Sequence, residues 1–121
     1  MSKTNRKSNQ ALVALIDDLR GQSRSTGFAL WRDIARRLEA SRKNWAEPNL
    51  SRLSRYAANE DTILIPGKLL GSGDVEGKHT VAAYSVSSSA REKIEAAGGK
   101  VVSIHDLMKK NPNGKGVYIL G

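Results

Sequence analysis

The sequence predicts an α/β protein with a helical, arginine-rich N-terminal half and a compact α/β C-terminal half. Apolar residues recur at helical spacing in the first half. After residue 61, short apolar runs alternate with serine-capped helical segments, as expected for strands connected by helices. A length of 121 residues suits one domain with a modest core. We expect that domain over residues 8–121, divided into 8–60 and 61–121, after a basic tail over residues 1–7 that becomes ordered on a partner.

Three helices are predicted in the N-terminal half. The first begins after Ser8 or Asn9, either of which can cap it, and ends at Gly21. The second covers residues 29–40, with an apolar stripe on one face and arginines on another. The third begins at Pro48, because proline suits the first turn of a helix.

Four short strands and two helices are predicted in the C-terminal half. The first strand stops at Pro66, and a glycine-rich loop follows over residues 67–77. Ser89 and Glu92 form a capping box for one helix, and Ser103 caps a shorter one. The strands are expected over residues 62–65, 80–86, 100–102 and 117–120, with a turn at 111–114.

The charge favours a polyanionic partner. The net charge is +8 and the pI about 10.1. Residues 1–60 carry 12 Lys/Arg against 6 Asp/Glu, whereas residues 61–121 carry 8 against 6. Nine of the 12 cations in the first half are arginine, which suits bidentate phosphate contacts and stacking on bases. The alternative is that the charge only maintains solubility, but its uneven distribution favours a nucleic-acid surface.

The composition argues against several other classes. The absence of cysteine excludes disulfides and thiolate metal or redox sites, and agrees with a cytoplasmic protein. The N-terminal residues do not form a signal peptide, and the longest purely apolar run, Ala11–Ile16, is too short to span a bilayer. With 5% aromatic residues, a large aromatic-lined ligand pocket is not expected.

The segment Arg42–Tyr56 is the strongest candidate for a binding surface. It carries four cations against one anion, two aromatic residues, and no group typical of a nucleophile, proton shuttle or metal ligand. Such a segment suits the binding of nucleic-acid phosphates. Trp45 either stacks on a base or sugar or packs against the third helix, whereas Trp31 adjoins an apolar stripe and is expected in the core.

The glycine-rich loop has three interpretations. A nucleotide-binding loop would need Lys and Ser/Thr after its second glycine and a helix directly behind them, and Lys68 instead follows the first glycine. A tight structural turn is the simplest alternative. The third is a loop whose free backbone amides, with Lys68, approach an RNA phosphate.

The sequence gives little support for a metal site or a catalytic centre. His79 and His105 lack metal-ligand spacing and are expected at the surface. Asp17 and Asp18 point in different directions on a helix, so they do not form a carboxylate dyad. No nucleophile-elbow motif occurs among the serines.

Motifs along nearly the whole chain resemble large-subunit ribosomal protein eighteen of archaea and eukaryotes, a family that shares a domain with bacterial large-subunit protein fifteen. The chain lacks long eukaryote-type extensions, and in this respect it resembles the archaeal form of the family. Pro48 stands where the family is expected to have an apolar, often β-branched residue. The resemblance rests on the order and spacing of KTN at residues 3–5, WRDIA at 31–35, RKN at 42–44, NLSR at 49–52, RYA at 55–57, IPGKLLGSG at 65–73, TVAA at 80–83, AREKI at 90–94, GG at 98–99 and NPNG at 111–114.

The resemblance implies a core of irregular β-β-α turns preceded by helices, and a non-catalytic, structural role on large-subunit ribosomal RNA. Neighbouring ribosomal proteins are the other expected partners; no cofactor, metal, small-molecule substrate, membrane or homo-oligomer is expected. On this hypothesis Asn49 contacts a base edge or 2′-hydroxyl, or instead caps the third helix. The candidate RNA-binding cations are Lys3, Arg6, Lys7, Arg24, Arg32, Arg36, Arg42, Lys43, Arg52, Arg55 and Lys68.

Two alternatives stay open at this point. One is a small DNA-binding regulator that uses the N-terminal helices as a helix-turn-helix, although a clear short turn and a dimer face are not evident. The other is a nucleotide-binding enzyme built on the glycine-rich loop, in which Lys68 would contact the phosphates.

Overall fold

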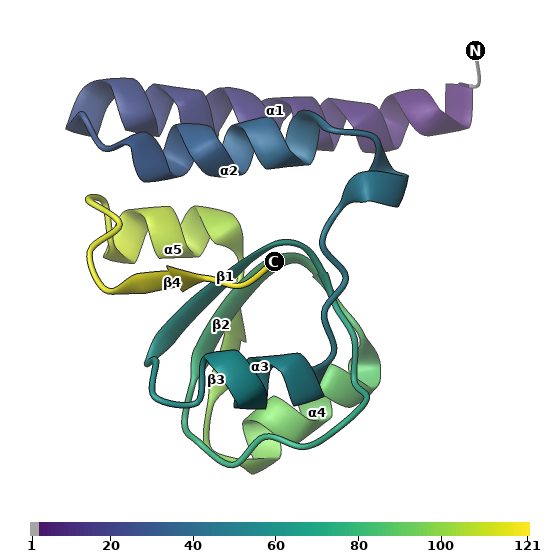
Figure 1. Ribbon diagram of the computed structural model, residues 1–121. Helices are drawn as coiled ribbons and strands as arrows, with labels where there is room; N and C mark the ends of the chain where they lie inside the picture. Colours follow the sequence, from purple (N-terminus) through teal and green to yellow (C-terminus); the bar gives the residue numbers. More distant parts are fainter. Residues whose placement is uncertain (1–2) are drawn as a thin grey trace.

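A helical hairpin lies against one face of a four-stranded sheet, and two further helices lie on the other side (Figure 1). The computed structural model describes residues 3–121, with side chains from Gln10 onward. The observed architecture confirms the predicted α/β class with its helical N-terminal half. Within residues 3–121, the helices lack the combination of length and apolarity needed to cross a bilayer.

The hairpin consists of α1 (Lys3–Thr26) and α2 (Ala29–Glu39). Both predicted ends of the first helix were wrong. It begins at Lys3, ahead of the apolar stripe, in a segment where lysine and arginine favour a helix but threonine, asparagine and serine do not. It also continues through Gly21 and ends before Gly27, whose φ of +77° is the left-handed conformation that terminates helices.

A connector joins the hairpin to the rest of the molecule. It contains a single 3₁₀ turn, η1 (Arg42–Asn44), and leads to α3 (Leu50–Tyr56). The third helix therefore begins two residues later than predicted. Pro48 is buried ahead of it, and its carbonyl accepts a hydrogen bond from the Leu70 amide at 2.8 Å.

The sheet is entirely parallel, in the order β3-β2-β1-β4. The prediction that the first strand stops at Pro66 was wrong. The pairing runs from Ile65 opposite Ala83 to Lys68 opposite Ser85, so the first strand has one extra residue at a bulge. Proline has no amide hydrogen, and a bulge accommodates it without a lost ladder bond. The strands are β1 (Thr62–Leu69), β2 (Thr80–Val86), β3 (Lys100–Val102) and β4 (Val117–Ile119).

The C-terminal helices follow an irregular β-β-α order. The first two strands are joined by the glycine-rich loop without a helix, and α4 (Ser88–Ala96) comes after both. Its cap is Ser87, not Ser89 as predicted, and the Ser87 side chain accepts a bond from the Ala90 amide. The cap of α5 (Ile104–Lys110) is Ser103, as predicted.

Alternate residues of the central strands contribute to two hydrophobic clusters. Leu64 and Ala82 face the hairpin and α5, in a cluster that includes Trp31. Ile63 and Val81 belong to a second cluster with residues from α3 and α4. Burial on both faces is typical of parallel sheets and explains the continuous apolar run of the first strand.

Trp31 anchors the hairpin to the turn that precedes the last strand. Its side chain is fully buried, as predicted, and its Nε1 donates to the Pro112 carbonyl at 2.8 Å. Gln22 donates to the same carbonyl at 3.1 Å. The NPNG turn therefore connects the C-terminal half to both helices of the hairpin.

We predict that Trp31→Ala lowers the free energy of unfolding by about 3–5 kcal/mol, because it leaves a large cavity and removes the bond to Pro112. Phe28→Ala is the matched control: this aromatic side chain is 44% exposed, and its loss should cost less than about 0.5 kcal/mol. Urea unfolding followed by circular dichroism measures both. Equal losses for the two variants would contradict the anchoring role of Trp31.

Candidate nucleic-acid interface

The exposed face of α2 carries the first group of candidate cations. Trp31, Ile34 and Leu38 are buried on the inner face, so Arg32 and Arg36 point to solvent, as the helical spacing predicted. Asp33 and Arg37, which are four residues apart, form an ion pair along the same helix, with Arg37 Nη2 lying 3.4 Å from Asp33 Oδ2.

Three arginines line a hollow of about 280 Å³ where the two hairpin helices meet. Arg24 and Arg32, which lie eight residues apart, are brought together here, with Gly27 beside them. Arg20 also lines the hollow and pairs with Glu39 across the hairpin. Sequence reasoning did not select Arg20, because only the antiparallel packing of the helices places it next to the other two.

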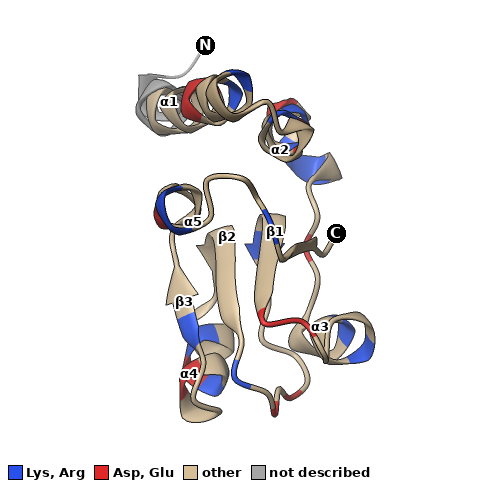
Figure 2. Ribbon diagram, turned by 90° about the vertical axis from the view of Figure 1, so that its left-hand side faces the viewer, with Lys and Arg blue, Asp and Glu red and all other residues tan. Residues whose placement is uncertain are grey.

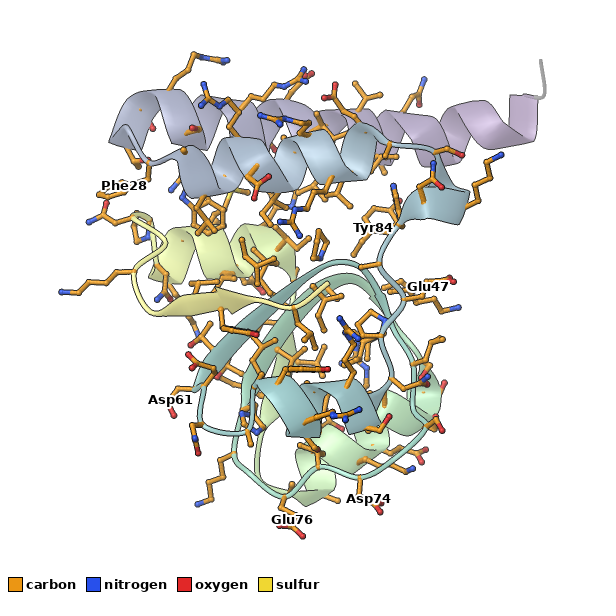
Figure 3. All side chains as sticks on the ribbon, in the orientation of Figure 1. Phe28, Glu47, Asp61, Asp74, Glu76 and Tyr84 are labelled. Atoms are coloured by element: carbon orange, nitrogen blue, oxygen red, sulfur yellow. The ribbon has the colours of Figure 1, made fainter. Side chains whose placement is uncertain are left out.

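The connector holds its arginine against two aromatic rings. The Arg42 guanidinium carbon lies 5.2 Å from the Trp45 ring centroid and 5.7 Å from that of Tyr84. Trp45 packs edge-on against Tyr84 of β2, and its Nε1 donates to the Ala40 carbonyl. The ring packs on the sheet and not on the third helix, so the expected packing against that helix was wrong, whereas stacking on a base or sugar stays a prediction. Figure 3 shows Tyr84 beside the connector.

The outer face of α3 combines cations with an exposed aromatic ring. Leu50 and Leu53 are buried, so Arg52, Arg55 and Tyr56 lie on the outer side. The guanidinium carbons of the two arginines lie 5.0 and 5.7 Å from the Tyr56 ring centroid. This face presents a polarisable ring and two positive charges together.

The candidate cations of the described region are accessible. In the part of the chain with described side chains, none of them forms an ion pair with a carboxylate. Figure 2 shows that α2, the connector and α3 follow one edge of the molecule, each bearing Lys or Arg. Asp74 and Glu76 lie at the end opposite the hairpin (Figure 3). The exposed cations are Arg24, Arg32, Arg36, Arg42, Lys43, Arg52, Arg55 and Lys68.

The glycine-rich loop is held by protein groups. The Leu70 amide donates to the Pro48 carbonyl, and the Ser72 amide to Asn49 Oδ1 at 3.2 Å. The Lys93 ammonium donates to the carbonyls of Gly71 and Gly73 at 2.9 and 2.7 Å. These contacts make the loop a structural crossover between two strands, and it is followed by β2 and not by a helix whose N-terminus could face a phosphate. A contact of Lys68 and the remaining loop amides with an RNA phosphate stays a prediction.

Asn49 and Lys68 flank this loop in different ways. Asn49 stands at the N-cap position of α3, but its side chain binds the loop and does not cap the helix. Lys68 is exposed, although its neighbours in β1 are buried. The Lys68 side chain is therefore accessible to a ligand, whereas Asn49 has a structural partner.

The histidines have protein partners. His79 is only 5% exposed, so the prediction of a surface position was wrong, and its Nδ1 lies 2.6 Å from the Glu60 carbonyl oxygen. His105 is exposed and its Nε2 lies 2.9 Å from Asp18 Oδ2, which links α5 to α1. Among the described residues, no three His, Asp or Glu side chains gather as metal ligands would.

The backbone of the hairpin bears on the N-terminal candidate cations and on the helix-turn-helix alternative. The backbone of Lys3, Arg6 and Lys7 belongs to α1, but the structure does not describe their side chains.

The α1–α2 hairpin is antiparallel (Figure 1), whereas the helices of a helix-turn-helix meet at about 90–120°. The hairpin therefore does not present a recognition helix in the way that a DNA-binding regulator requires.

Comparison with known proteins identifies the family of the chain. A family model described as ribosomal protein 60S L18 and 50S L18e matches residues 1–121. The chain belongs to this ribosomal protein family. Relatives named large ribosomal subunit protein eL18 include that of Methanospirillum hungatei JF-1, 48% identical over 120 residues and 99% of both chains. That of Methanoregula boonei is 45% identical over 99% of both, and that of Halobacterium salinarum 43% identical over 94% of this chain and 97% of its own.

In this member of the L18/L18e family, we predict that the loop geometry depends on Gly73. Its φ is +99°, and a Cβ placed on it would lie 2.6 Å from the Ser51 backbone nitrogen. Gly73→Ala should therefore destabilise the protein by more than the roughly 1–3 kcal/mol expected from backbone strain alone. Gly116→Ala is the control, since φ is +78° but no atom lies within 4 Å of the added carbon. Thermal unfolding compares them, and equal shifts would argue against the close contact.

Proposed function

We propose that this protein is a structural constituent of the large ribosomal subunit that binds large-subunit ribosomal RNA through its exposed cations. Family membership carries the proposal, because the matched family consists of ribosomal proteins and the match covers the whole chain. The relatives at 41–48% identity are named as proteins of the large subunit. We place the protein in the cytoplasmic ribosome, where it supports translation without catalysing a reaction.

The RNA surface that we propose follows the edge formed by α2, the connector and α3. Exposed arginines without carboxylate partners can contact phosphates without first breaking an ion pair. Arg24 and Arg32 converge at the hairpin hollow, so that site can hold one phosphate between two guanidiniums. Recognition is then mainly of RNA backbone and shape, with Lys68 as a separate contact.

The remaining parts of the chain have supporting roles in this proposal. Residues 8–121 act as one ribosomal-protein domain, whose sheet and glycine-rich loop fix the positions of the arginine-bearing helices. Lys3, Arg6 and Lys7 meet RNA at the start of the chain. Asn49 contributes through the loop that it holds. The acidic end with Asp74 and Glu76 suits a basic neighbouring protein and not RNA.

A sedimentation experiment tests the proposal directly. Cell extract is run through sucrose gradients at moderate and high salt, and the protein is followed across the fractions. We expect it to migrate with the large subunit at moderate salt, since many phosphate contacts hold it there. If the protein stays at the top of the gradient under both conditions, the ribosomal assignment is wrong, and DNA and nucleotide binding are tested next.

We also predict a steep salt dependence of binding to isolated large-subunit ribosomal RNA. If six of the exposed cations contact phosphates, the logarithm of the binding constant falls by about four to five for each tenfold rise in salt. Filter binding over a series of potassium chloride concentrations gives the slope. A slope near −1 would exclude a surface with several phosphate contacts.

The double variant Arg32→Gln/Arg36→Gln should make this slope shallower by about 1.5, because it removes two phosphate contacts from the α2 face. Lys109→Gln/Lys110→Gln is the matched control. It removes the same charge from exposed positions on α5, outside the proposed surface, and should leave the slope nearly unchanged. Equal effects of the two double variants would indicate a diffuse attraction to net charge instead of a defined surface.

A further inference from the structure

The exposed ring of Tyr56 is the feature that simple phosphate binding does not use. It is 52% exposed at the end of α3, where a phosphate contact alone would need only charge. Two guanidiniums lie over the ring, with the guanidinium carbon of Arg52 at 5.0 Å and that of Arg55 at 5.7 Å from the ring centroid. Trp45 and Tyr84, the other rings that lie close to a candidate arginine among the described residues, already pack on each other and are half-buried.

The helix that carries Tyr56 is firmly held although it has only seven residues. The Leu50 and Ser51 amides donate to the carbonyls of Leu70 and Ser72 at 3.1 and 3.0 Å. Ser54 Oγ donates to the Asp74 carbonyl further along the same loop. The glycine-rich loop thus fixes both turns of the helix, so the ring is in place before a ligand arrives and little ordering entropy is lost on binding.

We propose that Tyr56 is a stacking platform for one unpaired base of ribosomal RNA, while Arg52 and Arg55 contact the phosphates on either side of it. This inference rests on the proposed function and specifies which form of RNA the α3 face binds. A base inside a continuous A-form helix has both faces covered by its neighbours, so it cannot stack on a protein ring. The ligand is therefore a nucleotide in a loop or bulge, or at a strand end.

The chemistry of the site favours RNA over a protein partner. Any of the four bases can stack on the face of an aromatic ring, and base–aromatic stacking is a recurring contact of single-stranded nucleic acid. The adjacent guanidiniums can move from the ring to a phosphate and leave its face to the base, because among described side chains neither pairs with a carboxylate. A protein partner would have to supply an acidic and apolar surface together.

The test compares Tyr56→Ala with Tyr56→Phe in the full-length protein, using isolated large-subunit ribosomal RNA. Stacking predicts about tenfold weaker binding for the alanine variant and a change within about twofold for phenylalanine, which keeps the ring. The salt slope should be the same in both, because neither variant removes a charge. Phe28→Ala, which removes another exposed aromatic ring, is the control and should bind as the unchanged protein does.

Chemical probing of the same complexes locates the base. With the unchanged protein and with Tyr56→Phe, one base outside the helices should be protected, and with Tyr56→Ala that protection should be lost. Equal binding and protection for all variants would overturn the stacking proposal while leaving ribosomal RNA binding intact. Failure of the unchanged protein to bind the RNA would overturn both proposals. Circular dichroism confirms that the variants are folded.

Discussion

The parallel sheet must be kept from water on both faces, and the rest of the structure follows from that constraint. Leu64 and Ile63 are neighbours in the chain but point into different hydrophobic clusters. One cluster needs the hairpin and α5 as its cover, and the other needs α3, α4 and the glycine-rich crossover. A single layer of helices would leave half of the apolar strand residues exposed, at a cost proportional to the area left in water.

This constraint also determines where the positive charge is found. Each covering helix uses its inner face for the core, so its charged residues are confined to the outer face. In α2 this separates Arg32 and Arg36 from Trp31, and in α3 it separates Arg52 and Tyr56 from the buried leucines. The Leu70 and Ser72 amides of the loop bind the segment that leads into α3, and the cations of the helices are exposed, so we expect contacts to a polyanion to come from side chains more than from the backbone.

Features governed by local chemistry could be predicted from the sequence, whereas those governed by packing could not. The buried position of Trp31 and the outward arginines follow from helical spacing alone. The predicted end of the first strand at Pro66 was wrong. Proline normally ends a strand, and the bulge that accommodates it depends on pairing with β2. Gly27, not Gly21, ends the first helix, since only the turn into α2 requires a positive φ. The convergence of Arg20 with the other hairpin arginines depends on tertiary packing, which no local pattern encodes.

The bond between Trp31 and the Pro112 carbonyl has a consequence for the way the chain folds during its own synthesis. The hairpin is made first, but its apolar face is covered by strands and a turn that are made later. The edge strand β4 and buried Leu120 come almost last. Long-range contacts of this kind delay the completion of a core, because the intervening loop must close before they form. A nascent chain therefore displays its arginines early and completes its scaffold late, so a polyanion can meet the hairpin before the native fold exists.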